Sequence, residues 1–260
     1  ANGLRELVIA RAETVDGLVA LYAERELRKR DGKPHRLFSE PRLKIRRAEG
    51  MGPQPVKSTK AYDPSVGSEG IVAQLITELC RQFPRKFLNH PGPDQIRVTK
   101  ARSFFVVTDL VGSGTRARTY LEAAWKVRSV RSWWSAHFLR FEVITYAVTN
   151  IGRRAVESHH SKPRVSTVIP CPTISACFGP AKAEVMKNLC ATYDPMRKIA
   201  DSGDSLGYGG IGALVAFAHG APNNAPRIFH KKSGKWTPLF PARVTSTVSS
   251  QHFGRNLSAR

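Results

Sequence analysis

Apolar side chains recur at helical spacing in the middle of the chain. In residues 69–82 they occupy positions i, i+1, i+4 and i+5, which predicts a helix with one buried face and Ser68 as its N-cap. Residues 114–127 repeat this pattern. Residues 180–201 indicate a further helical segment.

Four shorter stretches are apolar along most of their length, which is typical of strands buried on both faces of a sheet. They are residues 103–109, 142–149, 165–169 and 213–218. Because strands and helices alternate, the pattern predicts an α/β fold with a mainly parallel central sheet and helices on both faces. Ligands of such sheets bind beside the carboxyl ends of the strands.

The first sixty residues follow a different pattern. One helical face is formed by Val15, Leu18, Val19 and Tyr22. It predicts a helix over residues 14–30, and the prolines that interrupt the basic stretch after it favour an irregular arm. We therefore expect a helix and basic arm over residues 1–60, an α/β domain over residues 61–241 and a basic tail over residues 242–260.

Charge adds a prediction about partners. Lys and Arg number 41 against 20 Asp and Glu, so the formal net charge is +21. This surplus indicates a polyanionic partner, with nucleic acid as the first choice and an acidic protein or a membrane surface as alternatives. The residues expected to contact nucleic acid are Arg28, Lys29, Arg30, Lys44, Arg46 and Arg47.

Composition narrows the class of protein. With 260 residues and 41% hydrophobic positions, the chain is long and apolar enough for a globular core. Its apolar stretches are too short to cross a bilayer. Its 4 cysteines show neither a CxxC pair nor zinc-ligand spacing, so we expect reduced thiols and a cytoplasmic location.

The turn after residues 103–109 carries the main candidate chemistry. Its polar and small residues are Gly112, Ser113, Gly114 and Thr115, directly before the predicted helix. Backbone N–H groups, hydroxyls and a helix N-terminus together suit an anion, and Asp109 can accept hydrogen bonds from a ribose diol. A plain tight turn is the alternative interpretation.

This run resembles the phosphoribosyl diphosphate motif of type I phosphoribosyltransferases. On that motif Asp109 takes the place of the second acid, and Ser113 and Gly114 take the Thr-Gly places. The chain departs from the motif at Thr108, where the first acid belongs, and at Arg116, where the final hydroxyl belongs. The resemblance implies a site for a phosphorylated ribose.

Four further segments extend the resemblance over residues 60–241. They are residues 63–70, 131–135, 220–224 and 235–240. Together with the turn they are similar to the phosphoribosyltransferase-like domain of bacterial conflict and anti-phage systems, including some retrons. The resemblance implies a defence effector or toxin that binds a phosphoribosyl-type ligand and acts at its anomeric carbon, by transfer or by glycosidic cleavage.

The wider resemblance also implies further site residues. Gly67 and Ser68 resemble the loop that holds pyrophosphate, and Glu69 is the second candidate catalytic acid, or simply an acid that favours the helix N-terminus. Asn223 and Asn224 are expected in the pocket or in a plain turn. Magnesium, carried by the diphosphate rather than caged by protein, is the expected metal.

A competing hypothesis is a catalytically inactive module. It would sense a nucleotide or dock on nucleic acid, for example as a subunit of a reverse transcriptase and its RNA–DNA product. Among the weaker signals, residues 203–212 are expected to be a lid or a flexible crossing, and His159 and His160 a surface loop. Trp133 and Trp134 are expected to stack on bases or to pack in the core.

Overall fold

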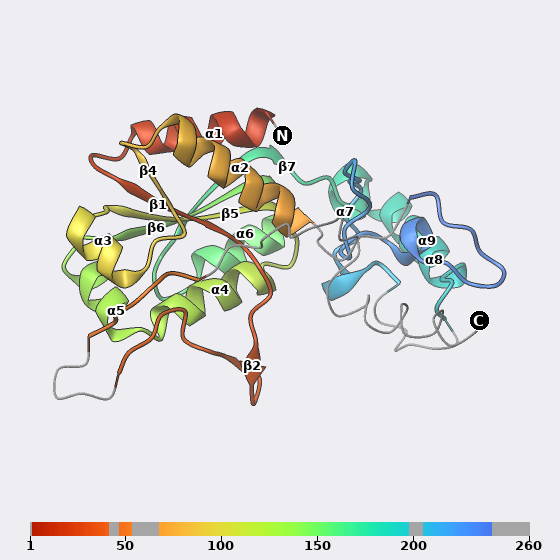
Figure 1. The fold of residues 1–260 in the computed structure, drawn as a ribbon. Coiled ribbons are helices and arrows are strands. Elements are labelled where there is room, and N and C mark those ends of the chain that lie inside the picture. Colours follow the sequence, from red (N-terminus) through yellow and green to blue (C-terminus); the bar gives the residue numbers. More distant parts are fainter. Residues whose placement is uncertain (1, 42–46, 54–67, 198–204, 241–260) are drawn as a thin grey trace, which may run out of the picture. The chain divides into compact units, whose positions relative to one another are not determined.

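A five-stranded sheet forms the centre of the fold (Figure 1). The computed structural model describes residues 2–41, 47–53, 68–197 and 205–240. The strand order is β4-β1-β5-β6-β7, and the pairs β1–β4, β1–β5 and β5–β6 are parallel. The strands are β1 (Val19–Ala23), β4 (Phe87–Asn89), β5 (Ser103–Val111), β6 (Arg140–Val148) and β7 (Arg164–Pro170). The predicted α/β fold class is thereby confirmed.

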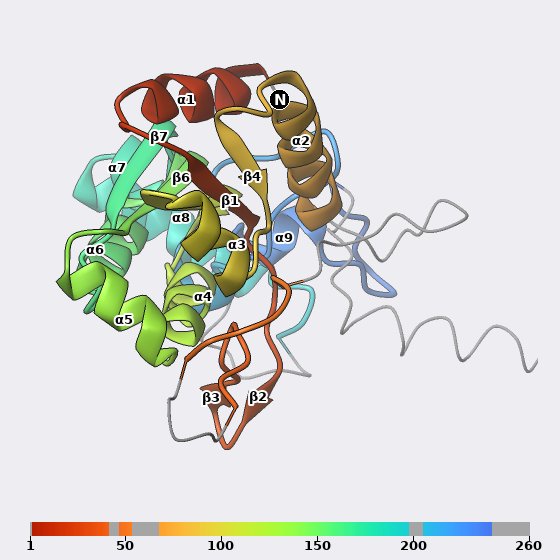
Figure 2. The same cartoon turned by 60° about the vertical axis from the view of Figure 1, so that its left-hand side comes forward.

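Helices cover both faces of this sheet (Figure 2). On one face α1 (Asn2–Glu13) and α2 (Ser68–Gln82) pack through Val8 and Ile76. The helices that contribute to the core of the other face are α3 (Pro93–Thr99), α4 (Thr115–Trp125), α5 (Arg128–Ser135) and α6 (Asn150–Glu157). The helices predicted over residues 69–82 and 114–127 are confirmed.

β5 lies at the middle of the sheet, and all of its residues are buried. Phe104 belongs to one core and Phe105 to the other, as the alternation of side chains along a strand requires. Tyr22 of β1 stacks on Phe104 with ring centroids 4.0 Å apart. The carboxyl ends of β1 and β5 therefore lie side by side, and this edge carries the candidate site.

The helix predicted over residues 14–30 is wrong. The N-terminal helix ends at Glu13, and residues 19–23 form β1 between β4 and β5. All five residues of β1 are buried, so the run is apolar because both faces of the strand are covered. The predicted boundary between residues 60 and 61 lies outside the described residues, as does the tail over residues 242–260.

Part of the expected basic arm folds as a hairpin. β2 (Lys29–Arg30) and β3 (Lys33–Pro34) pair antiparallel around Asp31 and Gly32, whose φ angles are 53° and 72°. An Asp-Gly turn with two left-handed residues is the preferred connection of such hairpins. Lys126 Nζ donates to the Pro34 carbonyl at 2.8 Å, which attaches the hairpin to the end of α4. No helix forms among residues 25–41 and 47–53.

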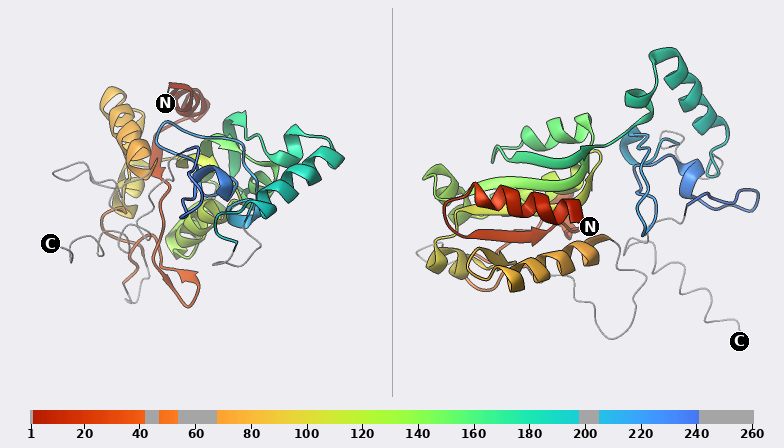
Figure 3. Two further views of the ribbon diagram at one scale, coloured as in Figure 1. Left: turned by 90° about the vertical axis from the view of Figure 1, so that its right-hand side faces the viewer. Right: turned by 90° about the horizontal axis from the view of Figure 1, so that it is seen from above.

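The described residues fall into two compact units, the first within Ala1–Lys57 and Glu69–Ile169 and the second within Ser58–Ser68 and Pro170–Arg260. The chain enters the second unit after β7 (Figure 3). Its elements are α7 (Ile174–Cys177), α8 (Pro180–Thr192), η2 (Tyr208–Gly210) and α9 (Arg227–His230). No helix in the described ranges is long and apolar enough to span a membrane.

Two predictions for the second unit need correction. The strand expected over residues 213–218 is wrong, because only isolated bridges form there, from Ala213 to Thr173 and from Phe217 to Gly220. This apolar run is partly exposed and no neighbouring strand pairs along it. The helix expected over residues 180–201 is shorter, since α8 ends at Thr192.

Candidate functional site

The turn between β5 and α4 is held in place by the start of α6. Thr149 Oγ1 donates to the Gly112 carbonyl at 2.6 Å, and the Thr149 N–H donates to the Val111 carbonyl at 3.1 Å. Gly114 has a φ of 79°, and a Cβ there would lie 2.8 Å from the Gly152 carbonyl oxygen. Only glycine allows this close approach of the turn to α6.

The donors of the turn are available to a ligand. No hydrogen bond among the described residues uses the backbone N–H of Ser113 or Gly114. The Ser113 and Thr115 hydroxyls lie 3.1 Å apart at the first turn of α4. Helix N-termini leave their first N–H groups unpaired and carry a partial positive charge, so the arrangement suits a phosphate or another oxyanion.

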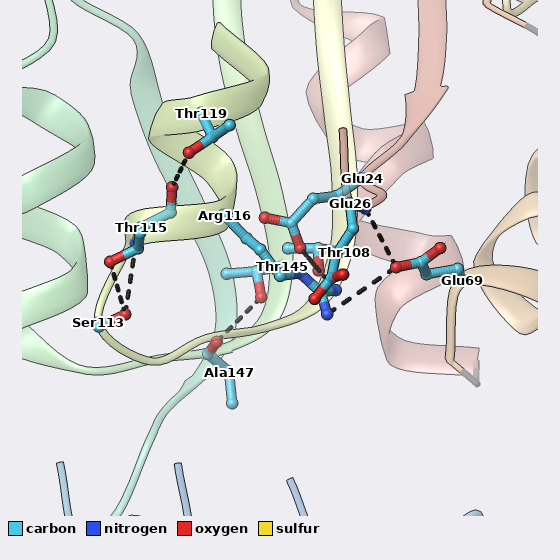
Figure 4. A network of polar contacts seen from close by, with 10 residues as sticks. All are labelled: Glu24, Glu26, Glu69, Thr108, Ser113, Thr115, Arg116, Thr119, Thr145 and Ala147. Atoms are coloured by element: carbon cyan, nitrogen blue, oxygen red, sulfur yellow. Dashed lines mark hydrogen bonds and ion pairs between the residues drawn. The ribbon is translucent and has the colours of Figure 1, made fainter. Parts of the chain in front are cut away.

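Beside the turn, one arginine joins several acidic side chains (Figure 4). Arg116 Nη2 donates to Glu24 Oε2 at 3.2 Å, and its Nη1 lies 3.9 Å from Glu69 Oε1. Glu24 Oε2 also accepts from the Thr108 hydroxyl at 2.6 Å. Glu69 Oε1 accepts from the Glu26 N–H at 3.3 Å. The network therefore ties β1, α2, β5 and α4 together at the carboxyl edge of the sheet.

The charged groups in this network shift one another's pKa values. Glu24 raises the pKa of Arg116, with smaller contributions from Glu69 and Asp109, so the guanidinium is always charged. Burial raises the pKa of Glu69, and the nearby Arg116 works in the opposite direction. Arg116 is thus a permanent cation within ion-pair distance of Glu24 and Glu69.

Most of the predicted sugar-phosphate residues lie in the first unit, whereas Ser68 falls in the second. Asp109 lies inside β5 and is buried, rather than at an open strand tip, and it acts on Arg116 electrostatically. Ser68 is the first residue of α2, and Glu69 pairs with Arg116 instead of facing open solvent. Gly67 lies outside the described residues. The catalytic and binding roles of these residues stay predictions.

Asn223 and Asn224 belong to the second unit, where they stabilise local structure. Asn224 Nδ2 donates to the Tyr208 carbonyl at 2.9 Å, and the Asn223 carbonyl accepts from the Tyr208 N–H at 2.7 Å. These contacts fit the turn role left open by the sequence. Of the possible lid over residues 203–212, the first two positions lie outside the described residues.

The residues predicted to bind nucleic acid are exposed wherever the structure describes them. Arg28, Lys29 and Arg30 lie at and beside β2 of the hairpin, and Arg47 is exposed as well. Lys44 and Arg46 lie outside the described residues. Trp134 packs edge-on against Trp125 at 5.1 Å and donates from Nε1 to the Ser161 carbonyl, so it serves the interior.

His159 corrects another expectation, because it is buried rather than part of a surface loop. Its Nδ1 lies 2.8 Å from Ser161 Oγ, and its Nε2 lies 3.3 Å from Glu122 Oε2. This Ser-His-Glu arrangement resembles a catalytic triad in connectivity only. Ser161 is 1% exposed, so its hydroxyl is closed to substrate and the cluster is structural.

Glu24 and Thr149 are residues of the candidate site that sequence reasoning missed. Glu24 directly follows the apolar run 19–23, and an acid at the end of a buried strand is a signal for the ligand edge of a parallel sheet. The signal was hidden because that run was assigned to a helix. Thr149 directly follows β6 and caps α6, which is a common pattern without a functional sign of its own.

The described residues do not fit a metal ion held by the protein. Nowhere in the described ranges do three or more His, Cys, Asp or Glu side chains form a group that could hold one. Glu24 and Glu69 are engaged by Arg116.

The fold and the turn together define a phosphoribosyltransferase-like protein, with a parallel sheet whose central strand leads into a glycine-rich, hydroxyl-bearing helix start. The chain matches the PRTase-CE family model over residues 66–242, more than half of its length, and it belongs to this family. A search of curated proteins finds no match to the chain.

Proposed function

We propose that this chain is an effector of a bacterial anti-phage defence system, such as a retron, and that it binds a phosphoribosyl-type ligand. The observation that carries the proposal is the turn at Ser113 and Gly114, with free N–H groups at the carboxyl edge of β5. Membership of the PRTase-CE family supports it, because the matched region contains this turn.

The proposed reaction takes place at the anomeric carbon of the ribose. The bond from C1 to the leaving diphosphate or base breaks, and the leaving group takes the electron pair. An acceptor hydroxyl, amine or water forms the new bond to C1 and gives its proton to the leaving group. The turn would hold the 5′-phosphate through its N–H groups. Asp109 and Glu69 would stabilise the positive charge that develops on the sugar ring in the transition state.

The experiment is ligand binding and turnover by paired variants. Addition of 5-phosphoribosyl 1-diphosphate should raise the melting temperature of the protein, because a ligand that binds only the folded state stabilises it. Ser113→Ala should weaken this shift. Asp109→Asn should abolish diphosphate release and, in cells that carry the defence locus, toxicity or defence.

Two matched variants control for general damage. Asp16→Asn and Ser135→Ala make the same chemical changes at exposed positions away from the turn. Both should behave as the parent protein. A parent protein whose melting temperature does not respond to the ligand, or full toxicity in both Ser113→Ala and Asp109→Asn, would contradict the proposal.

A second candidate function is docking on nucleic acid by a catalytically inactive subunit, for example on a reverse transcriptase and its RNA–DNA product. It is favoured by the net charge of +21 and by the exposed basic hairpin β2–β3. Purification of the protein shows whether nucleic acid copurifies with it. A protein that purifies free of nucleic acid and does not bind an RNA–DNA hybrid at low salt would exclude docking.

A cytoplasmic location is part of the proposal. The cysteines of the described residues, Cys80, Cys171, Cys177 and Cys190, are all free thiols, as expected in a reducing compartment.

A further inference from the structure

Arg116 occupies the position of a cation among the acidic side chains of the site. Its guanidinium donates to Glu24, lies within ion-pair distance of Glu69 and interacts electrostatically with Asp109. Arg116 follows the phosphate-type turn directly, since α4 begins one residue before it. Glu24 directly follows β1, Glu69 lies in α2 and Asp109 lies in β5, so the acids come from three separate parts of the fold.

These acids pose an electrostatic problem for a phosphorylated ligand. The carboxylates of Glu24, Glu69 and Asp109 all act on Arg116, the second residue of α4. Their negative charge would repel a phosphate bound at the start of this helix, because like charges at close range in a partly buried site interact strongly. The Glu24 side chain is only 2% exposed, so its charge needs a partner inside the protein. An oxyanion can bind at this edge only if a cation offsets the carboxylates.

The chain fixes such a cation in place. Glu24 is oriented by the Thr108 hydroxyl and by its own N–H, which donates to the Val107 carbonyl at 2.9 Å. The oriented carboxylate in turn positions Arg116, whose side chain stays 34% exposed. A guanidinium has five N–H donors, so those not used by Glu24 remain for a ligand.

We propose that Arg116 is the resident cation of this site, and that the chain therefore binds its phosphorylated sugar without a divalent metal ion. The identity of the ligand rests on the proposed function above. The ion pairs of Arg116 with Glu24 and Glu69 do not depend on it. Glu24, acting through Arg116, is a positioning residue.

The first test compares binding of 5-phosphoribosyl 1-diphosphate in EDTA and in millimolar magnesium. The parent protein should bind equally well in both. Arg116→Ala should lose roughly tenfold or more in affinity in EDTA, since a charge-assisted contact to phosphate is removed, and should recover affinity in magnesium. A parent protein that needs magnesium for binding overturns the inference.

Two further variants separate charge from structure. Arg118→Ala, an exposed arginine of the same helix, is the matched control and should bind as the parent does in both buffers. Arg116→Lys keeps the charge and should still bind in EDTA. Loss of binding in EDTA by Arg116→Lys would overturn the role of Arg116 as a cation. If Arg116→Ala does not fold, Arg116→Gln replaces it.

The second test needs no ligand. Without the guanidinium, Glu24 and Glu69 lose their cation and should attract magnesium, so millimolar magnesium should raise the melting temperature of Arg116→Ala but not of the parent or of Arg118→Ala. An equal response in parent and Arg116→Ala, or none in either, overturns the inference. If the sugar diphosphate binds under no condition, the proposed function fails, and this second test still decides the role of Arg116.

Discussion

Several residues of the candidate site contact residues that are distant in the sequence. Thr108 shows this best: the resemblance places it where an acid belongs, and its hydroxyl holds the Glu24 carboxylate at 2.6 Å. A carboxylate is thus present beside β5, supplied by β1. The sequence shows threonine at position 108 in place of the acid of the motif. That a carboxylate from elsewhere in the chain lies beside it became visible only in the fold.

The environment of His90 predicts that the folded protein loses stability at acidic pH. Its Nε2 accepts the Ala23 N–H at 2.9 Å, so the folded protein requires a neutral ring. Burial, and to a smaller degree Arg25, lower the pKa of His90 to about 4. Between that pH and about 6.5, the ordinary pKa of histidine, the unfolded chain binds the extra proton, so stability should fall as the pH drops through this window.

His90→Asn tests this prediction, because asparagine tolerates the left-handed backbone, with its φ of 47°, at this position. We expect lower stability at pH 7 but a shallower loss between pH 6.5 and 4, measured by urea unfolding. The pKa values of His159 and His230 are also lowered, and both residues remain in the variant, so only the difference between the two proteins counts. Equal slopes would refute the assignment.

The substitution Gly114→Ala tests how tightly the backbone of the turn is constrained. The new Cβ would meet the Gly152 carbonyl at 2.8 Å in a backbone of positive φ. We expect a loss of about 1–3 kcal/mol in the free energy of unfolding. Gly179→Ala is the control, because a Cβ there meets nothing within 4 Å. Equal stability of the two variants would show that the turn adapts.

At the scale of elements, the central strands explain why prediction succeeded in some places and failed in others. α2, α4 and β5 were predicted because each has a local pattern long enough to identify it. The prediction for β1 failed because five buried apolar residues fit a strand and a helix face equally well. Its assignment depends on pairing with β4 and β5, which local spacing does not reveal.

The attachment of α1 to the sheet gives a prediction at this scale. Arg11 Nε donates to Glu142 Oε1 at 2.7 Å, and Ser166 Oγ donates to the same oxygen at 2.6 Å, so Glu142 joins α1, β6 and β7. Glu142→Gln should destabilise the protein by about 1–3 kcal/mol, because buried donors lose their charged acceptor.

Glu157→Gln is the matched control for Glu142→Gln. Glu157 is exposed and pairs with Arg153 one helical turn away, a geometry worth about 0.3–0.5 kcal/mol. Thermal or urea unfolding compares the two variants. A loss at Glu142 no larger than that at Glu157 would mean that the three elements are held together by apolar packing alone.

At the scale of the whole molecule, the net charge of +21 dominates the expected behaviour in solution. Its exposed part includes Arg28, Lys29 and Arg30 of the hairpin segment. If these three side chains contact phosphates, changing all of them to Gln should reduce the slope of log affinity against log salt by about 2–3 for an RNA–DNA hybrid.

The control for this prediction removes the same charge elsewhere. Arg81, Arg85 and Arg154 are exposed elsewhere in the first unit. Their triple change to Gln should leave the slope nearly unchanged, as measured by fluorescence anisotropy across a salt series. Equal effects of the two triple variants would indicate diffuse attraction by the net charge, without a defined contribution from the hairpin.

By itself the sequence determined the α/β class, the central strand with its glycine-rich turn, and the excess of basic side chains, because each is encoded in neighbouring residues. The tertiary structure alone decided that Glu24, Thr108 and Arg116 meet, and that Glu69 joins them. Their positions depend on which strands pair and on where α2 and α4 begin beside them. Such contacts arise from parallel pairing between distant segments, and no local pattern records them.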